Sequence, residues 1–383
     1  MKKLYGIILC ILVITAILSI SLVTSGCNQK KEIKIGVILS LTGKVTKYGE
    51  DSKRGMDIAV EEINAGKKYP FSLKLLYEDD KAEATTAVSA LRKLIEVDRV
   101  PIIVGFILSN NALACAPIAE SKKVNILITC ASAEKIKDAG DYIFRIRESA
   151  AIHGREMANY ARNTLTINEV AILYANAENG YSYSRAFQEE FLKLGGTIVF
   201  TESFEEGEKD FRSLITKAKA KNPEGVYLAG LPIELGLILQ QSKELKFEPK
   251  NWIASSGAED PKLIEIAKGA ADGLIISSPP FDPSSSNEKV KDFVKSYQKQ
   301  YNSEPAVLAA NGYDAVYIIA DVIRQYGSSS EEIKTGLYHI KDFEGVGGRI
   351  SLDEFGEAQR PVLFKKVINE KFEIIKQSTS DNV

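Results

Sequence analysis

Buried strands and amphipathic helices alternate along this chain, and the alternation restricts its fold more than any other feature of the sequence. Ile35–Leu39 is an apolar run typical of a buried strand, and apolar residues then recur at helical spacing from Met56 to Ile63. The unit repeats with strands expected at 73–77, near 102 and at 125–128, and with helices expected at 84–95 and 112–121. Strands that are apolar on both faces need helices on both sides, so we expect a parallel sheet of the α/β class.

A second series of the same unit begins after Phe144. Its strands are expected at 170–174, 197–200, 226–229, 252–254 and 274–277, and its helices at 154–162, 184–194, 211–220 and 233–245. Single hydrophobic cores stop growing at about 250 to 300 residues, and this chain has 383. We therefore expect two doubly wound, Rossmann-like lobes. The turn-rich stretch Pro279–Ser286 indicates a crossing between them. It precedes helices expected at 287–301 and 308–326, a short helix, and a hairpin-like end at 349–375.

The N-terminus has the pattern of an export signal. Two lysines are followed by an uncharged stretch over 4–23, and small residues lead to Cys27. Thr-Ser-Gly-Cys resembles a bacterial lipobox, whose cysteine carries the lipid, although Thr24 stands where a leucine is usual. We expect residues 1–26 to be a lipoprotein signal peptide, 27–32 a tether, and Cys27 a lipid anchor to the cell membrane, outside the cytoplasm. An alternative is an uncleaved membrane helix, because about 20 apolar residues span a bilayer.

Composition argues against several classes of function. The formal charge is -2 and no block of five like charges occurs, so we expect no nucleic-acid partner. Neither of the two histidines lies in a nucleophile motif, and no closely spaced Cys or His pairs occur, so we expect no enzyme, no cofactor and no metal site. Cys115 and Cys130 are the cysteines of the folded part, and the sequence leaves open whether they are bridged.

A polar cluster follows the strand expected near Ile102. The apolar run ends at Gly105, and Leu108, Ser109 and Asn110 precede the next helix. A helix N-terminus offers unpaired N–H groups and a serine hydroxyl both donates and accepts, so this cluster can hold a small anion. The simpler interpretation is that Ser109 or Asn110 only caps the helix.

Short segments spread over residues 33–375 also share their order with a known family. They are Ile33–Gly43, Tyr48-Gly49, Glu61–Asn64, Tyr77–Asp80, Val104-Gly105, Phe144-Arg145, Asn311–Ala315 and Gln359–Val362. Together they resemble the extracellular solute-binding proteins of branched-chain amino acid ABC transporters, the type I periplasmic binding proteins. In that family two doubly wound lobes, joined by three hinge crossings, close on a ligand and pass it to an ATP-driven importer.

The resemblance implies both an organisation and a function. With crossings near residue 150, Pro280 and Phe343, lobe 1 takes residues 33–150 plus 280–342, and lobe 2 takes 151–279 plus 343–383. The expected function is a substrate-binding lipoprotein that captures a small carboxylate- or amide-bearing solute, such as a branched-chain or other amino acid. Its partners would be permease and ATPase subunits. An alternative is a ligand sensor that presents its closed form to a receptor.

Ligands of open parallel sheets bind beyond the carboxyl ends of the strands, so we expect a cleft where the two sheets face each other. The resemblance implies that Ser109 and the segment of Ala131 and Ser132 hold the α-carboxylate of the ligand, and that Tyr48 contacts it. Further candidates follow strands of either lobe: Leu108, Asn110 and Thr129 in the first, and Asn179, Tyr181, Leu231, Ser255 and Ser256 in the second. An alternative for Tyr48, Tyr181 and Leu231 is an ordinary place in a loop.

One departure from the family concerns the ligand's ammonium group. Amino-acid binders of this type carry an acid after the strand that matches Trp252–Ala254, whereas this chain has Ser-Ser-Gly-Ala at 255–258. A buried ammonium without a carboxylate partner is costly. Two possibilities remain open. The acid is replaced from elsewhere, or the ligand has no ammonium and is an aromatic acid, a keto acid or a urea-like amide. The candidate replacements are Glu178, Glu234, Glu259 and Asp260.

Overall fold

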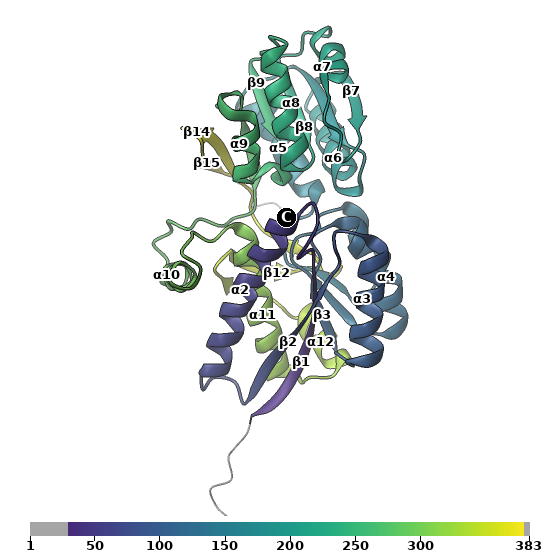
Figure 1. Cartoon of the computed structure of the whole chain (residues 1–383), viewed down its shortest axis with the longest axis vertical. Helices are drawn as coiled ribbons and strands as arrows, with labels where there is room; N and C mark the ends of the chain where they lie inside the picture. Colours follow the sequence, from purple (N-terminus) through teal and green to yellow (C-terminus); the bar gives the residue numbers. More distant parts are fainter. Residues whose placement is uncertain (1–29, 379–383) are drawn as a thin grey trace, which may run out of the picture.

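The computed structural model describes residues 30–378, which form two lobes stacked along the long axis of the molecule (Figure 1). The expected signal peptide and the expected lipid site Cys27 lie outside the described residues. Within the described part of the chain, no helix is both long enough and apolar enough to cross a membrane.

A five-stranded parallel sheet in the order β2-β1-β3-β4-β5 forms the first lobe. Its strands are β1 (Lys31–Leu39), β2 (Phe71–Asp79), β3 (Ile102–Gly105), β4 (Asn125–Ile128) and β5 (Ile143–Arg145). One face is covered by α2 (Thr46–Ala65), α11 (Val307–Tyr326) and α12 (Ser330–Tyr338), and the other by α3 (Ala84–Arg92) and α4 (Ser109–Lys122). Neighbouring residues of one strand, such as Val37 and Ile38, enter cores on opposite faces, which explains why the strands are apolar throughout.

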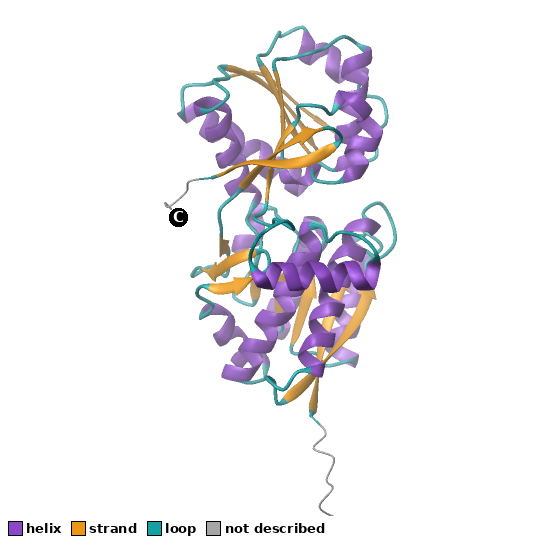
Figure 2. Ribbon diagram, turned by 90° about the vertical axis from the view of Figure 1, so that its left-hand side faces the viewer, coloured by secondary structure: helices purple, strands orange, loops and turns teal. Residues whose placement is uncertain are grey.

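The second lobe is built on a seven-stranded sheet in the order β15-β14-β10-β9-β8-β6-β7. The parallel strands are β6 (Glu169–Ala175), β7 (Thr197–Phe204), β8 (Gly225–Ala229), β9 (Asn251–Ala254) and β10 (Ile275–Ser278), and β14 (Leu363–Ile368) with β15 (Lys371–Gln377) adds an antiparallel hairpin. One face is covered by α5 (Ala150–Asn163) and α6 (Glu178–Lys193), and the other by α7 (Arg212–Lys219), α8 (Pro232–Glu244) and α9 (Pro261–Ala267). Figure 2 shows strands between helices in both lobes.

A small antiparallel sheet changes the expected position of the last crossing. It consists of β11 (Phe343–Gly345), β12 (Gly348–Leu352) and β13 (Ala358–Gln359). We expected residues from Phe343 onward to belong to lobe 2, but Ile350, Leu352 and Ala358 are buried in the core of the first lobe. We therefore infer that the third crossing lies at 360–362, directly before β14. The other two crossings then run over 146–149, after β5, and from residue 279, after β10.

Two helices of the first lobe approach each other closely because of glycines. A Cβ on Gly55 of α2 would lie 1.9 Å from the carbonyl oxygen of Ala309, and one on Gly312 of α11 would lie 2.4 Å from that of Ser52. Helix α10 (Glu288–Tyr301) packs on the same pair and contributes to a core of its own with them. This packing fixes the start of α2, which lies at the boundary between the lobes (Figure 1).

Candidate ligand-binding cleft

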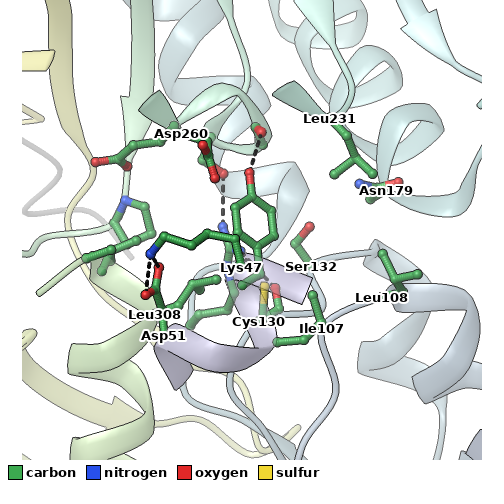
Figure 3. A pocket seen from close by; sticks show the side chains of 18 of the residues that line it. Lys47, Asp51, Ile107, Leu108, Cys130, Ser132, Asn179, Leu231, Asp260 and Leu308 are labelled. Carbon is green, nitrogen blue, oxygen red and sulfur yellow. Dashed lines mark hydrogen bonds and ion pairs between the residues drawn. The ribbon is translucent and has the colours of Figure 1, made fainter. Parts of the chain in front are cut away.

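A cavity of about 280 Å³ lies between the two lobes (Figure 3). Its walls come from segments that follow the carboxyl ends of strands in both sheets. In the first sheet, β1 lies between β2 and β3, and in the second, β6 lies between β7 and β8, so the chain path in each lobe reverses direction at the first strand of the lobe. The cavity therefore lies at the switch point of both sheets, where open α/β sheets bind ligands.

Half of the candidate residues line this cavity, three from each lobe. They are Tyr48, Leu108, Ser132, Asn179, Leu231 and Ser256. Ser109 and Asn110 line a smaller neighbouring cavity of about 130 Å³, which shares Leu108 and Asn179 with the main one. These residues come from segments far apart in the sequence, so the fold brings them together.

Ser109 is the first residue of α4 and does not act as its cap. The N-cap residue is Leu108, which makes no side-chain capping bond. The Ser109 hydroxyl instead accepts hydrogen bonds from the backbone N–H groups of Ser132 and Ala133, both at 3.1 Å. Ser109 thus ties the loop after β4 to the start of α4, and the N–H of Ser132 has a partner within the protein.

The other four candidates do not line the two cavities, for identifiable reasons. Thr129 is buried, and its hydroxyl donates to the carbonyl oxygen of Gly105 at 3.2 Å. Ala131 is buried within the loop after β4, and its N–H donates to the carbonyl oxygen of Phe106. Ser255 is fully buried, whereas Tyr181 is 48% exposed on the outside of α6. Ala131 and Ser255 directly precede Ser132 and Ser256, which do line the cavity, so neighbouring side chains point in different directions here.

Arg147 is a cavity residue that the sequence did not suggest to us. It lies on the first crossing and is only 7% exposed. Its guanidinium donates to the carbonyl oxygen of Cys130 at 2.8 Å, to the hydroxyl of Ser256 at 2.9 Å and to that of Tyr183 at 3.5 Å. It therefore joins a loop of the first lobe to two elements of the second. A charged residue directly after a buried strand is the signal that could have indicated it.

Two of the four candidate acids lie away from the main cavity. Glu178 forms an ion pair with Lys135 at 2.8 Å, which joins the two lobes. Glu234 accepts a hydrogen bond from the backbone N–H of Gly207 at 2.9 Å. Both carboxylates are therefore engaged outside the cavity, so neither replaces the acid that is missing from 255–258.

The other two candidate acids line the main cavity. Glu259 forms an ion pair with Lys365 and accepts a hydrogen bond from the Ser278 hydroxyl at 2.5 Å. Asp260 is 8% exposed and accepts a hydrogen bond from the N–H of Lys262 at 2.7 Å, which caps α9. Burial raises the pKa of Asp260, and the N–H of Lys262 only partly offsets this effect. Asp260 is thus the acid that remains available to a ligand.

Direct contacts join the lobes around the cavity. The Tyr48 hydroxyl donates to the carbonyl oxygen of Gly257 at 3.3 Å. At the rim, Lys44 of the first lobe forms an ion pair with Glu206 of the second. The lobes therefore approach closely enough to enclose a small molecule between them.

The hinge between the lobes contains buried ion pairs. Arg360 on the third crossing pairs with Glu148 on the first, with 3.1 Å between Nε and Oε1. Burial alone would raise the pKa of Glu148, but Arg360 and the adjacent His153 outweigh it and hold that pKa at about 2. Arg145 and Glu357 form a second buried pair beside it. The Arg360–Glu148 pair ties the first and third crossings together, whereas Arg145 and Glu357 lie within the first lobe.

Cys115 and Cys130 are both free and both buried. Cys130 lines the main cavity next to Arg147, whereas Cys115 lies on the buried face of α4. Burial raises the pKa of Cys115 to about 12 and also raises that of Cys130. Both side chains are therefore protonated thiols at neutral pH.

Comparison with known proteins gives a consistent set of matches. Residues 32–371 match the model of a family described as periplasmic binding protein. The Leu/Ile/Val-binding protein of Escherichia coli (strain K12) is 26% identical over 341 residues, which cover 88% of this chain and 91% of that protein. The crystal structure of a leucine-binding protein from Thermotoga maritima has a TM-score of 0.86 and 30% identity, covering 92% of this chain and all of that one. A branched-chain amino acid transporter substrate-binding protein from Streptococcus pneumoniae, solved in complex with isoleucine, has a TM-score of 0.83 and 26% identity, with 90% and 99% covered.

Proposed function

Since this chain belongs to the periplasmic binding protein family, we propose that it is the substrate-binding lipoprotein of an ABC importer. Its ligand is a small solute that bears a carboxylate or an amide. The named relatives bind leucine, isoleucine or valine, which supports an amino acid or a related compound. Membership of the family implies a location outside the cytoplasm, and the lipid anchor on Cys27 rests on the sequence alone.

The observation that carries this proposal is a cavity whose walls come from both lobes at the carboxyl ends of their strands. The hydroxyls of Ser132 and Ser256 and the guanidinium of Arg147 supply hydrogen-bond donors of the kind that hold a carboxylate. Leu108 and Leu231 supply apolar surface on opposite sides. A ligand held in this way joins the lobes and stabilises their closed arrangement.

The size of the cavity limits the ligand. At about 280 Å³ it lies just below the range for small-molecule sites, which is about 300–1,000 Å³. This volume suits a metabolite of amino-acid size and excludes a folded partner or a long peptide. We propose reversible binding without catalysis, because delivery to an importer requires that the solute leave unchanged.

Identification of the solute that copurifies with the protein tests this function. The full chain is purified in detergent from cells that produce it and is then unfolded, and the released small molecules are identified by mass spectrometry. We expect one dominant carboxylate or amide that rebinds the refolded protein at a ratio of one to one. Uptake of that solute should also fall in cells that lack the protein. Normal uptake despite specific binding would favour the sensing alternative, and the absence of any bound solute would contradict both.

A further inference from the structure

The main cavity carries a buried cation whose hydrogen-bond partners are all neutral. The Arg147 guanidinium bonds a carbonyl oxygen and two hydroxyls, and its Nε is buried without any partner. Among residues 30–378, no carboxylate lies within ion-pair distance of it. The adjacent Glu148 attracts the guanidinium electrostatically but forms its own ion pair with Arg360, so a ligand anion can pair with Arg147 directly.

The same cavity carries a buried carboxylate in the converse situation. Asp260 is 8% exposed, and the hydrogen bond that it accepts comes from a neutral backbone N–H. Lys47 lies near enough to lower the pKa of Asp260, but within the described chain the ion pair of Lys47 is with Asp51. The oxygen of Asp260 that does not cap α9 therefore remains free for a cation.

The remaining charges on the cavity wall have partners or face solvent. Lys47 pairs with Asp51, and Glu259 pairs with Lys365. Glu304 is exposed at the rim. Arg147 and Asp260 are thus the two buried charges on this wall that a ligand can neutralise.

The two charges line the same cavity as the phenol of Tyr48, and both act on it. Burial raises the pKa of Tyr48, the charge of Asp260 raises it further, and the charge of Arg147 lowers it. The Tyr48 hydroxyl bonds Gly257 and Arg147 bonds the adjacent Ser256, and Asp260 follows three residues after Gly257 in the same segment. One small molecule can therefore reach both.

We propose that Arg147 and Asp260 are the two poles that select a zwitterionic ligand. The guanidinium pairs with the ligand's carboxylate, and the carboxylate of Asp260 pairs with its ammonium group. Asp260 thereby takes the part of the acid that is missing from 255–258, and does so from the N-cap of α9. This inference rests on the proposed function, and it resolves the two possibilities that the sequence left open in favour of an amino acid.

Calorimetric titration with matched ligands tests the assignment. The full chain, freed of endogenous solute, is titrated with the twenty amino acids. The tightest of them is then compared with its 2-oxo acid, which lacks the ammonium, and with its decarboxylated amine. We expect Asp260→Asn to weaken binding of the amino acid by about 10- to 100-fold. The affinity for the 2-oxo acid should change by less than about threefold. Arg147→Gln should weaken binding of both the amino acid and the 2-oxo acid. The affinity for the amine should change by less than about threefold.

Two exposed residues of the same lobe provide matched controls, Asp272→Asn and Arg155→Gln, which should leave every affinity unchanged. Thermal unfolding checks that each variant is folded. If Arg147→Gln does not fold, the titrations of Asp260→Asn test the assignment alone. Binding of the 2-oxo acid as tightly as the amino acid, or equal weakening of both by Asp260→Asn, would overturn the assignment while the transport function stands. Failure of every solute to bind would overturn both.

Discussion

Arg360 and Glu148 form a fully enclosed ion pair that connects the third crossing of the chain to the first. The Arg360 guanidinium also donates to the carbonyl oxygen of Ile146 at 2.9 Å, so it holds the first crossing at two points. Two of the three hinge segments must therefore move together when the lobes change their separation. Arg147, which faces the cavity, lies between these points on the same crossing.

Loss of the Glu148 charge should destabilise the whole protein. Glu148→Gln leaves Arg360 buried without its carboxylate, and breaking a buried pair from one side costs about 3–5 kcal/mol. Urea denaturation at pH 7 measures this loss. Glu331→Gln, which removes an exposed partner of the Tyr142 hydroxyl, is a matched control and should cost less than about 1 kcal/mol. A loss below that value for Glu148→Gln would show that the pair does not support the hinge.

The same pair should make stability depend on acid pH. The pKa of Glu148 is about 2 in the folded protein, below its ordinary value of 4.5. Its stabilising contribution is therefore present above pH 4.5 and is lost as the pH falls toward 2. The gap in unfolding free energy between wild type and Glu148→Gln should shrink by about 2 kcal/mol between pH 7 and pH 3. A gap that stays constant or widens would contradict this assignment.

Asp314 should have the opposite effect. Its carboxylate accepts hydrogen bonds from the N–H groups of Val346 and Gly347, both at 2.8 Å, and burial raises its pKa to about 6. A carboxyl group with a raised pKa binds its proton more tightly in the folded state, so its contribution to stability falls as the pH rises from about 4 to about 6. Wild type should lose about 2 kcal/mol relative to Asp314→Asn between pH 4 and pH 7, measured by urea denaturation. An unchanged difference would show that Asp314 does not titrate in this range.

The contact between α2 and α11 should not tolerate a methyl group. Gly55→Ala places a Cβ 1.9 Å from the carbonyl oxygen of Ala309, so the helices must separate. Overpacking of this kind costs about 1–3 kcal/mol or more, and the better helix propensity of alanine returns only about 1 kcal/mol. Gly269→Ala is the control, because its Cβ would meet only the Lys243 amine at 3.5 Å. Equal thermal stability of the two variants would contradict the packing described here.

The ion pair at the rim should contribute modestly to ligand affinity. Lys44→Ala removes the bond to Glu206 that joins the lobes, and an exposed pair contributes at most about 1 kcal/mol, or about fivefold in affinity. The effect should disappear at high salt. Lys217→Ala is the matched control, because the pair of Lys217 with Glu202 lies within the second lobe. An equal change in affinity for both variants would show that the pair between the lobes has no role in closure.

The sequence was sufficient to predict the bounds of an element where burial alone decides the structure. Residues 125–128 are apolar apart from Asn125 and were expected as a strand, and β4 has those bounds. Helix α6 begins at Glu178, well before the expected 184, because Gly180 weakens the helical pattern there. That glycine is needed, since a Cβ would lie 2.3 Å from the carbonyl oxygen of Ala175. β5 and α9 were not expected because they are short.

Long-range contacts explain what the sequence could not indicate. The segment after Phe343 joins the first lobe through Asp314, which lies about thirty residues away and holds the turn before β12. The position of a strand end predicted that Ser132 and Ser256 would face the cleft, and the family resemblance predicted the same of Tyr48. Strand-end position did not predict that Arg147 lines the cavity, because the direction of its side chain depends on how the first crossing passes between two lobes.

A crystal structure of the protein with its copurified solute tests the central claim most directly. We predict that the solute lies in the cavity between the lobes, contacts Tyr48 or Ser132 from the first and Ser256 from the second, and places its carboxylate within hydrogen-bond distance of Arg147. A solute that contacts one lobe only, with the cavity between the lobes left empty, would contradict the account.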